Sequence, residues 1–173
     1  IGNTETKIFL ITTNHKIKKR ITFSTKNLNQ VKLNQLFNHF IIDYKKLKKI
    51  LFCSVVPFSF SMIKSFLSKK TILKCYEVKS LNLRSLIKIK ANYKQVGSDR
   101  LTNAISLINN KTNFIILDFG TATTFDVLIK DYYYGGVIAP GVKLSLNTLS
   151  DKATLIPKIN LKKSKNIVGS NTI

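Results

Sequence analysis

The sequence predicts a mixed α/β fold, and two observations support this prediction. Short segments with the alternating apolar residues of strands follow one another across tight turns, and segments with apolar residues at helical spacing separate the groups of strands. Apolar residues make up 44% of the 173 residues, which is ordinary for a globular protein and too many for a disordered one. The chain can therefore form one large core or two small ones.

The N-terminal part of the chain predicts two strands and a helix. Residues 7–12 and 20–25 alternate as strands do and flank a polar turn at 13–16. Apolar residues then recur at helical spacing, which predicts a helix over about residues 28–42. The basic run at 45–49 is typical of a solvated face.

The next part predicts a strand, a helix and a strand, followed by an extended segment. A buried strand is expected at 50–56, where Pro57 stops it. Helical spacing at 62–67 marks the helix, and residues 71–78 form the second strand. Residues 87–93 alternate, which indicates a strand or an extended segment leading into a glycine.

The last predicted elements are one short helix and three closely spaced strands. Helical spacing covers residues 101–108, and strands are expected at 114–118, 123–130 and 133–138. In the run Tyr132-Tyr133-Tyr134, strand alternation favours one buried tyrosine over a stacking platform for bases.

A turn at Asn109-Asn110-Lys111 is the candidate domain boundary. It separates the last helix from the three strands. We therefore expect one domain over residues 1–111 and a second over residues 112–173.

Two small, hydroxyl-bearing turns stand in similar positions in the two domains. Gly2-Asn3-Thr4 and Gly120-Thr121-Ala122-Thr123-Thr124 each lead into a strand. Such turns let backbone N–H groups approach a phosphate closely, and threonine hydroxyls add donors. Each alone is also consistent with an ordinary strand connection, but as a pair they could hold a nucleotide from both sides.

The formal net charge of +21 first suggests a nucleic-acid ligand. Only Arg20, Arg84 and Arg100 among the 29 basic residues are arginines, whereas base reading and bidentate phosphate contacts favour arginine. The lysines are also spread along the chain rather than clustered. A nucleic-acid partner is therefore disfavoured.

The cysteine content and the apolar runs bear on the cellular location. Cys53 and Cys75 lie in apolar segments, and a reduced pair of thiols is favoured over a disulfide. The longest apolar runs are far shorter than the roughly 20 residues that a membrane span needs. No signal peptide is recognisable, and we expect a cytoplasmic protein without a membrane partner.

Two carboxylates occupy positions suited to chemistry. Asp99 lies in a Gly-Ser-Asp-Arg turn at a helix start, where it suits a proton-accepting base and a helix N-cap equally well. Asp118 ends an apolar strand, where a carboxylate needs a cation or backbone N–H partners. Asp126 alternates with apolar residues in the next strand and is interpreted as structural rather than catalytic.

Five segments together resemble the type III pantothenate kinase family in order and spacing. A further segment, Ser54-Val55-Val56-Pro57, is similar to a family strand that ends in a valine-proline pair. The five segments are Ile1-Gly2-Asn3-Thr4, Gly97-Ser98-Asp99-Arg100, Asp118-Phe119-Gly120-Thr121-Ala122-Thr123-Thr124, Gly135-Gly136-Val137-Ile138-Ala139-Pro140-Gly141 and Gly169-Ser170-Asn171-Thr172.

The resemblance implies a fold and an activity. The family belongs to the superfamily of acetate and sugar kinases, actin and chaperone ATPases, with two ribonuclease H-like lobes and ATP in the cleft between them. It implies ATP-dependent phosphorylation of pantothenate to 4′-phosphopantothenate, the first step of coenzyme A biosynthesis, by a homodimer. The expected cofactors are ATP with Mg²⁺ and a monovalent cation, K⁺ or NH₄⁺.

The resemblance also assigns the ATP and cation contacts. Thr121 would contact the ATP phosphates, and Asp118 would hold the monovalent cation. The first phosphate loop would comprise Gly2, Asn3, Thr4, Glu5, Thr6 and Lys7.

The catalytic base implied by the resemblance is Asp99. Arg100 would supply a cation for the pantothenate carboxylate or for the transferring phosphate. Tyr93 would line the pantothenate pocket, although Lys94-Gln95 replaces the Asn-Pro pair that the family often has after it. The remaining residues expected to bind substrate are Gly97, Ser98 and Thr172.

The resemblance further implies a chain truncated at both ends, with the leading aspartate of the first loop missing and the second lobe incomplete. The activity is expected of the full-length protein, and a chain truncated in this way need not be active by itself. Two other functions are weighed against the kinase: a non-catalytic accessory relative of the same family, and a basic nucleic-acid-binding protein. The presence of Asp99, Asp118 and Thr121 disfavours the accessory relative.

Overall fold

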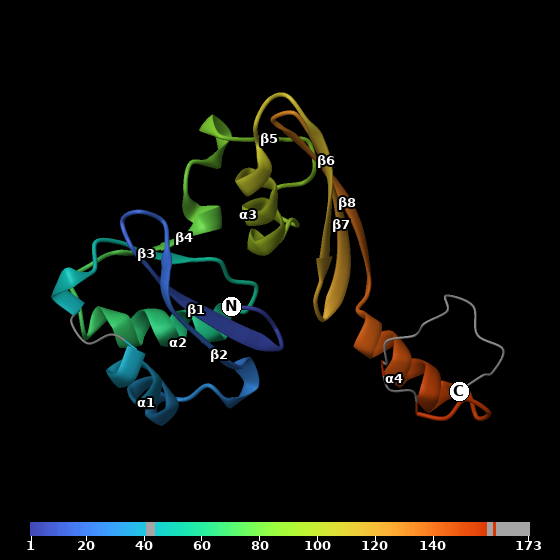
Figure 1. Cartoon of the computed structure of the whole chain (residues 1–173), viewed down its shortest axis with the longest axis horizontal. Helices are drawn as coiled ribbons and strands as arrows, with labels where there is room; N and C mark the ends of the chain where they lie inside the picture. The colour runs from blue at the N-terminus through green and yellow to red at the C-terminus, as the bar shows by residue number, and fades with distance from the viewer. Residues whose placement is uncertain (41–43, 159–160, 162–173) are drawn as a thin grey trace.

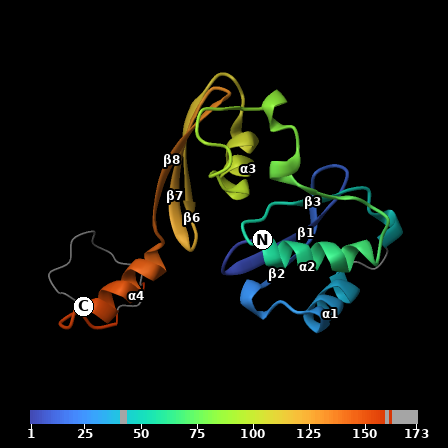
Figure 2. The same cartoon turned by 180° about the vertical axis from the view of Figure 1, so that it is seen from behind.

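The protein has a mixed α/β fold, as the sequence predicts. The computed structural model describes residues 1–40, 44–158 and 161. Figure 1 shows two groups of elements, one from each half of the chain, and a last helix that projects from the end of the second group. Seen from behind in Figure 2, the two groups remain side by side.

The first group combines two small sheets with two helices. Strands β1 and β2 pair antiparallel, and β3 and β4 pair parallel. Their apolar side chains share one hydrophobic core with the two helices, in which the rings of Phe37 and Phe66 lie 5.3 Å apart. The elements are β1 (Glu5–Ile11), β2 (Ile17–Ser24), α1 (Gln30–Phe40), β3 (Ile50–Phe52), α2 (Pro57–Ser68) and β4 (Cys75–Glu77).

The second group is a four-stranded sheet with the strand order β5-β8-β7-β6. The long strands are antiparallel, and the short β5 runs parallel to β8. Helix α3 packs on one face of this sheet, where Leu101, Leu128 and Tyr133 are fully buried. The elements are β5 (Lys88–Ile89), α3 (Ser98–Leu107), β6 (Asn113–Phe119), β7 (Ala122–Ile129) and β8 (Tyr132–Pro140).

Each of the two groups has its own hydrophobic cluster. The second cluster includes Val78 and Leu83 as well as Leu128 and Tyr133, so it draws on both sides of the predicted boundary at residue 111. That boundary stays a prediction. Tyr133 is fully buried while Tyr134 is half exposed, which confirms the expectation of one buried tyrosine in that run.

Three predicted strands are shorter than expected. The strand expected at 50–56 ends at residue 52, because Pro57 begins α2 and residues 53–56 form the extended approach to it. The strand expected at 71–78 is limited to 75–77. The segment at 87–93 contributes only two residues to the sheet.

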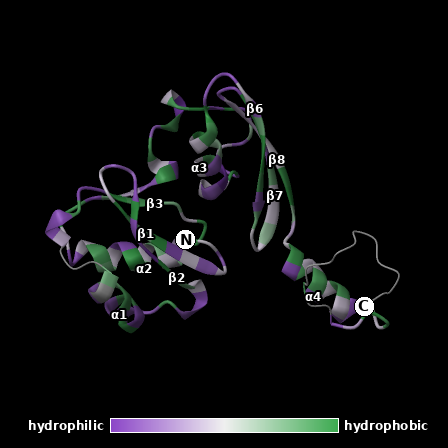
Figure 3. Ribbon diagram, in the orientation of Figure 1, coloured by the Kyte–Doolittle hydropathy of each residue, from purple (hydrophilic) through white to green (hydrophobic). Residues whose placement is uncertain are grey.

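Helix α4 (Val142–Lys152) was not predicted. None of its residues is buried, and Val142, Leu144 and Leu149 are all more than 40% exposed. Figure 3 shows apolar residues on this helix, although it projects away from the two groups. Val142, Leu146 and Leu149 recur at helical spacing in its sequence, so a pattern that indicates this helix was present but was not used.

Two further expectations concern the thiols and the membrane. Cys53 and Cys75 are free, which confirms the predicted reduced pair. Within the described part of the chain, no helix combines the length and apolar character needed to cross a membrane.

Candidate active site

The two predicted phosphate turns meet where the two groups of elements face each other. The side-chain hydroxyls of Thr4 and Thr121, 117 positions apart in the sequence, lie 2.5 Å apart and share a hydrogen bond. Both threonines are exposed, so their hydroxyls are accessible to a ligand. The structure therefore brings together the two turns that the sequence singled out.

A buried threonine holds the first turn in shape. Within the turn, the Gly2 N–H donates to the Glu5 carbonyl oxygen at 3.0 Å. The Thr25 hydroxyl donates to the Gly2 carbonyl oxygen at 2.7 Å, and the Thr25 N–H donates to the Thr4 carbonyl oxygen at 3.0 Å. Sequence reasoning missed Thr25, which no motif marks.

The other residues of the first phosphate loop divide by exposure. Thr6 is 1% exposed, and its hydroxyl shares a hydrogen bond of 2.9 Å with the Thr25 hydroxyl, so it faces the interior. Asn3, Glu5 and Lys7 are exposed. Glu5 and Lys7 form a surface ion pair with 3.9 Å between Oε2 and Nζ.

Gly141 supports the second turn from behind. Its N–H donates to the Thr121 carbonyl oxygen at 3.0 Å. A Cβ at this position would lie 2.4 Å from the carbonyl oxygens of both Gly120 and Thr121. Only a glycine permits this close approach of backbone to backbone, so the Pro140-Gly141 loop is part of the framework of the second turn.

Asp99 lies in the first turn of α3, beside the start of the first phosphate loop. Gly97 is the N-cap residue, so neither Ser98 nor Asp99 takes the capping position considered from sequence. A Cβ on Gly97 would lie 3.6 Å from Val55, whose N–H donates to the Ile1 carbonyl oxygen at 3.0 Å. These contacts place the start of α3 next to the strand that carries the first loop.

The Asp99 carboxylate has one local partner. Its Oδ1 accepts a hydrogen bond of 2.8 Å from the Arg100 N–H. The side chain is half-buried, and the positive end of the α3 dipole stabilises its negative charge. Such a carboxylate can accept a proton from a hydroxyl that is brought against it.

Ser98 is held by a carboxylate of the preceding segment. It is 3% exposed, and its hydroxyl donates to Glu77 Oε1 at 2.5 Å. Glu77 Oε2 accepts a further bond of 3.2 Å from the Ser80 N–H. Glu77, which the sequence did not mark, thus fixes the start of α3.

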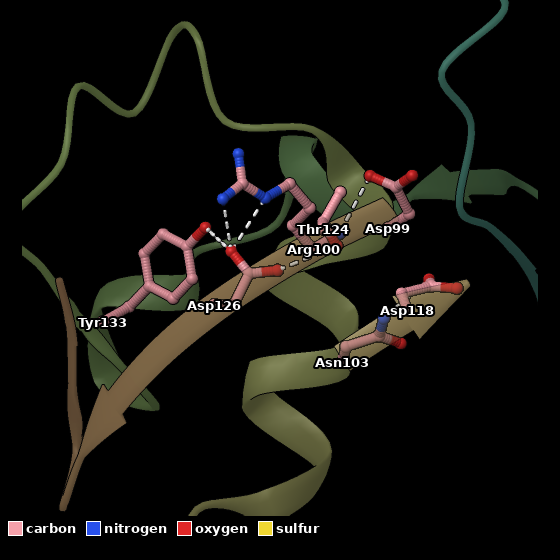
Figure 4. Close-up of polar contacts among 7 residues, drawn as sticks. All are labelled: Asp99, Arg100, Asn103, Asp118, Thr124, Asp126 and Tyr133. Carbon is pink, nitrogen blue, oxygen red and sulfur yellow. Dashed lines mark hydrogen bonds and ion pairs between the residues drawn. The ribbon is translucent and has the colours of Figure 1, made fainter. Parts of the chain in front are cut away.

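Arg100 turns from α3 onto the face of β7. Its Nε donates to Asp126 Oδ1 at 2.7 Å, and its Nη2 lies 2.6 Å from the same oxygen (Figure 4). The Tyr133 hydroxyl donates to that oxygen at 2.5 Å. Burial lowers the pKa of Arg100, but the hydrogen bond and charge of Asp126 outweigh this and the net shift is upward. Sequence reasoning did not connect these three residues.

Asp118 lies at the end of β6 and is exposed. Its Oδ2 accepts a hydrogen bond of 3.1 Å from Asn103 Nδ2 on α3 (Figure 4). Among the described residues, no cluster of three or more His, Cys, Asp or Glu side chains could enclose a metal ion. An exposed carboxylate of this kind can contribute one ligand to a cation whose other ligands come from water, backbone or a bound phosphate.

Tyr93 lines a cavity of about 590 Å³ formed by residues of the segment that precedes α3. Its ring lies 5.3 Å from Lys79 Nζ, and its hydroxyl donates to the Lys79 carbonyl oxygen. Burial, and next the charge of Glu77, raise the pKa of Tyr93. The cavity is basic, with Lys79, Arg84 and Lys88 on its wall, and neither Asp99 nor the two phosphate turns line it.

The structure therefore brings together some, but not all, of the residues of the predicted site. The two phosphate turns are in contact, and the start of α3 with Asp99 lies beside the first of them. Tyr93 lies in a separate cavity, and Thr172 is outside the described residues. Exposed hydroxyls on two turns, together with a carboxylate at a helix start, suit the binding and transfer of a phosphoryl group.

Comparison with known proteins gives a consistent result. A family model described as type III pantothenate kinase matches residues 1–173. A curated type III pantothenate kinase from Pelagibacter ubique is 62% identical over 173 residues, which is all of this chain and 70% of that protein. One from Sulfurihydrogenibium sp. is 38% identical over 185 aligned residues, covering 100% of this chain and 71% of its own length.

A solved structure resembles this fold at lower sequence identity. It comes from Campylobacter jejuni and is described as a conserved protein assigned to the Baf family of transcriptional activators. It superposes with a TM-score of 0.51 at 18% identity, covering 89% of this chain and 62% of that one. At this identity the likeness concerns the fold alone.

Proposed function

The chain belongs to the type III pantothenate kinase family, and from this premise we propose that it transfers the γ-phosphoryl group of ATP to pantothenate. The product is 4′-phosphopantothenate, and the reaction is the first step of coenzyme A biosynthesis. The observation that carries the proposal is the direct contact of the two phosphate turns, with the start of α3 packed near Val55, which bonds to Ile1 at the start of the first turn. The chain spans about 70% of the curated relative's length, and the proposal concerns the whole protein.

ATP is held between the two turns. The first loop, residues 2–7, and Thr121 supply backbone N–H groups and hydroxyls to the phosphates, which is how small turns bind anions. Thr25 and Gly141 keep the turns in shape from behind. Loop residues that point inward, such as Thr6, contribute through the backbone rather than through their side chains.

Asp99 accepts the proton of the pantothenate hydroxyl. Phosphoryl transfer needs little covalent help from the protein, so orienting the nucleophile and balancing charge are its main contributions. The resemblance assigns Arg100 as a cation for the substrate carboxylate or the phosphoryl group, although in this structure its guanidinium is paired with Asp126. The resemblance adds Gly97, Ser98, Thr172 and Tyr93 to the proposed acceptor site, although Tyr93 lines a separate cavity in this structure.

The described residues fit Mg²⁺ and a monovalent cation in different ways. Mg²⁺ usually keeps several waters and binds through one or two carboxylates plus substrate phosphates, which agrees with the lack of an acidic cluster in the described ranges. Mg²⁺ would supply charge neutralisation on the phosphates. The Asp118 carboxylate, with Asn103 on only one of its oxygens, would hold K⁺ or NH₄⁺.

We also propose the family's two ribonuclease H-like lobes, with residues 1–111 in one and residues 112–173 in part of the other. The two separate hydrophobic clusters support two lobes, although the second cluster combines residues from both sides of position 111. The exposed apolar side chains of α4 support a homodimer in which a second copy covers them. The free thiols agree with a cytoplasmic location.

The experiment that tests the function is Asp99→Asn in the full-length protein. We expect pantothenate-dependent ADP formation to fall by about 10²–10⁴-fold, the usual contribution of a general base. ATP binding, measured by calorimetry, should remain nearly intact, since Asp99 belongs to neither phosphate turn. Unchanged turnover would remove Asp99 from its role, and a wild-type protein without pantothenate-dependent turnover would reject the function.

A further inference from the structure

Asp126 is the one fully buried carboxylate among the described residues. It lies in the middle of β7, where Thr124, Asp126 and Leu128 point to the same side as α3. Removing a carboxylate from water costs several kcal/mol, so it persists only with charged or hydrogen-bonding partners. Its partners therefore indicate why it is there.

The partners of Asp126 converge on one oxygen. Oδ1 accepts hydrogen bonds from Arg100 Nε at 2.7 Å and from the Tyr133 hydroxyl at 2.5 Å, and Arg100 Nη2 lies 2.6 Å away. Oδ2 has a weaker contact of 3.4 Å with the Thr124 hydroxyl. Burial, and next the hydrogen bond to Asp126, raise the pKa of Tyr133 well above its usual range, so it remains a donor. These residues join α3 to β7 and β8.

The network turns the Arg100 guanidinium away from the Asp99 carboxylate, although the charge of Asp99 still acts on it through space. Arg100 directly follows Asp99, yet Figure 4 shows its guanidinium pointing toward Asp126 and away from the Asp99 carboxylate. Among the described residues, the Asp99 carboxylate accepts a hydrogen bond from the Arg100 backbone N–H. A guanidinium released from Asp126 could pair with the neighbouring Asp99 carboxylate. Such a pair would lower the pKa of that carboxylate and weaken it as a base.

We propose that Asp126 and Tyr133 are positioning residues that hold the Arg100 guanidinium against the sheet and so keep the Asp99 carboxylate free to accept a proton. This inference rests on the proposed function, because it takes Asp99 as the base. Neither Asp126 nor Tyr133 touches the reacting atoms. They act through Arg100.

The test is a double-mutant cycle in the full-length protein, with Asp126→Asn, Arg100→Gln and the double variant. The readouts are kcat, KM for pantothenate and the acid limb of the pH profile of kcat/KM, which reports the base of the free enzyme. Asp126→Asn should lower kcat about tenfold or more. It should also move the acid limb down by about one pH unit, because a carboxylate beside an arginine has a lowered pKa. Arg100→Gln, which leaves no guanidinium to pair with Asp99, should not move the acid limb down.

The double variant decides whether Asp126 acts through Arg100. Adding Asp126→Asn to Arg100→Gln should change neither kcat nor the acid limb further. Tyr133→Phe, which keeps the ion pair, should give the same change as Asp126→Asn in smaller measure. Two matched controls come from the same β7–β8 hairpin: Asp131→Asn, whose carboxylate pairs with Lys88 of β5, and Tyr134→Phe, whose ring is half exposed. In both variants kcat should stay within about twofold of wild type.

The outcomes separate positioning from a structural role. If Asp126→Asn does not fold, because Arg100 keeps an unpaired buried charge, then Tyr133→Phe and the double variant carry the test. The inference would be overturned if the acid limb does not move in Asp126→Asn, or in Tyr133→Phe where Asp126→Asn is not folded. It would also be overturned if Asp126→Asn lowers kcat equally with and without Arg100. A wild type without pantothenate-dependent turnover would instead reject the proposed function.

Discussion

Gly97 sets the position of the proposed base, and Gly97→Ala tests this directly. Gly97 has φ −63° and ψ 149°, a backbone conformation that alanine also adopts. The new Cβ would lie 2.4 Å from Asp99 Oδ1, while its contact with Val55 at 3.6 Å is ordinary. The substitution therefore acts on the Asp99 carboxylate rather than on the backbone.

The size of the effect follows from that distance. The carboxylate must move by about 1 Å to reach the ordinary contact distance of 3.4 Å. A misplacement of about 1 Å can cost about 10²-fold in rate, or about 2.7 kcal/mol in activation free energy. Exchanging glycine for alanine at an N-cap costs only about 1 kcal/mol or less in stability. We therefore expect kcat to fall about 100-fold in a protein that is still folded.

The assay is initial-rate ADP formation at saturating ATP and pantothenate, with calorimetric ATP binding and a thermal melt alongside. ATP affinity should stay within about twofold of wild type, because neither phosphate turn is touched. In the Asp99→Asn background, Gly97→Ala should lower kcat no further. A folded Gly97→Ala variant with wild-type kcat, or one whose loss of rate matches a loss of ATP affinity, would refute the reasoning.

Three further predictions follow from the site. Thr121→Val removes a donor to a charged phosphate, worth about 1.5–3 kcal/mol, and should raise the calorimetric Kd for ATP by about tenfold or more, whereas an unchanged Kd would contradict phosphate binding there. Asp118→Asn should abolish the difference in turnover between K⁺ and Na⁺ buffers; a variant still stimulated by K⁺ would exclude Asp118 as the cation ligand. Because the pKa of Tyr133 is raised on folding, its contribution to stability is complete below the usual tyrosine pKa of about 10 and is lost as the pH rises beyond it. Denaturant titrations at several pH values should therefore show that, above about pH 10, the free energy of unfolding falls less steeply with pH in Tyr133→Phe than in wild type, by up to about 1.4 kcal/mol per pH unit. The same slope in both proteins would contradict this.

The sequence was most informative where local chemistry decides the structure. The small turns at Gly2 and Gly120 could be paired from composition alone, because each joins a glycine to threonines before a strand. Their contact through Thr4 and Thr121 could not be predicted, since it depends on how two halves of the chain pack. The same limit applies to Thr25, a buried polar residue whose partners are distant in sequence.

Elsewhere the tertiary structure overrode the local pattern. Residues 53–56 are apolar enough for a strand, but the start of α2 at Pro57 and the contact with Ile1 keep them extended outside the sheet ladder. Asp126 was interpreted as structural from its alternation with apolar residues, and its link to Arg100 depends on α3 lying across β7. Helix α4 was missed although Val142, Leu146 and Leu149 recur at helical spacing.

The hydrogen bond between Thr4 and Thr121 has a consequence for how a nucleotide enters. In this contact one threonine hydroxyl donates to the other, and the bond links the two turns. An arriving phosphate exchanges one neutral hydrogen bond for charge-assisted ones, which are about twice as strong. The fold thus holds the two hydroxyls close together, so less conformational entropy is lost in arranging them around an anion.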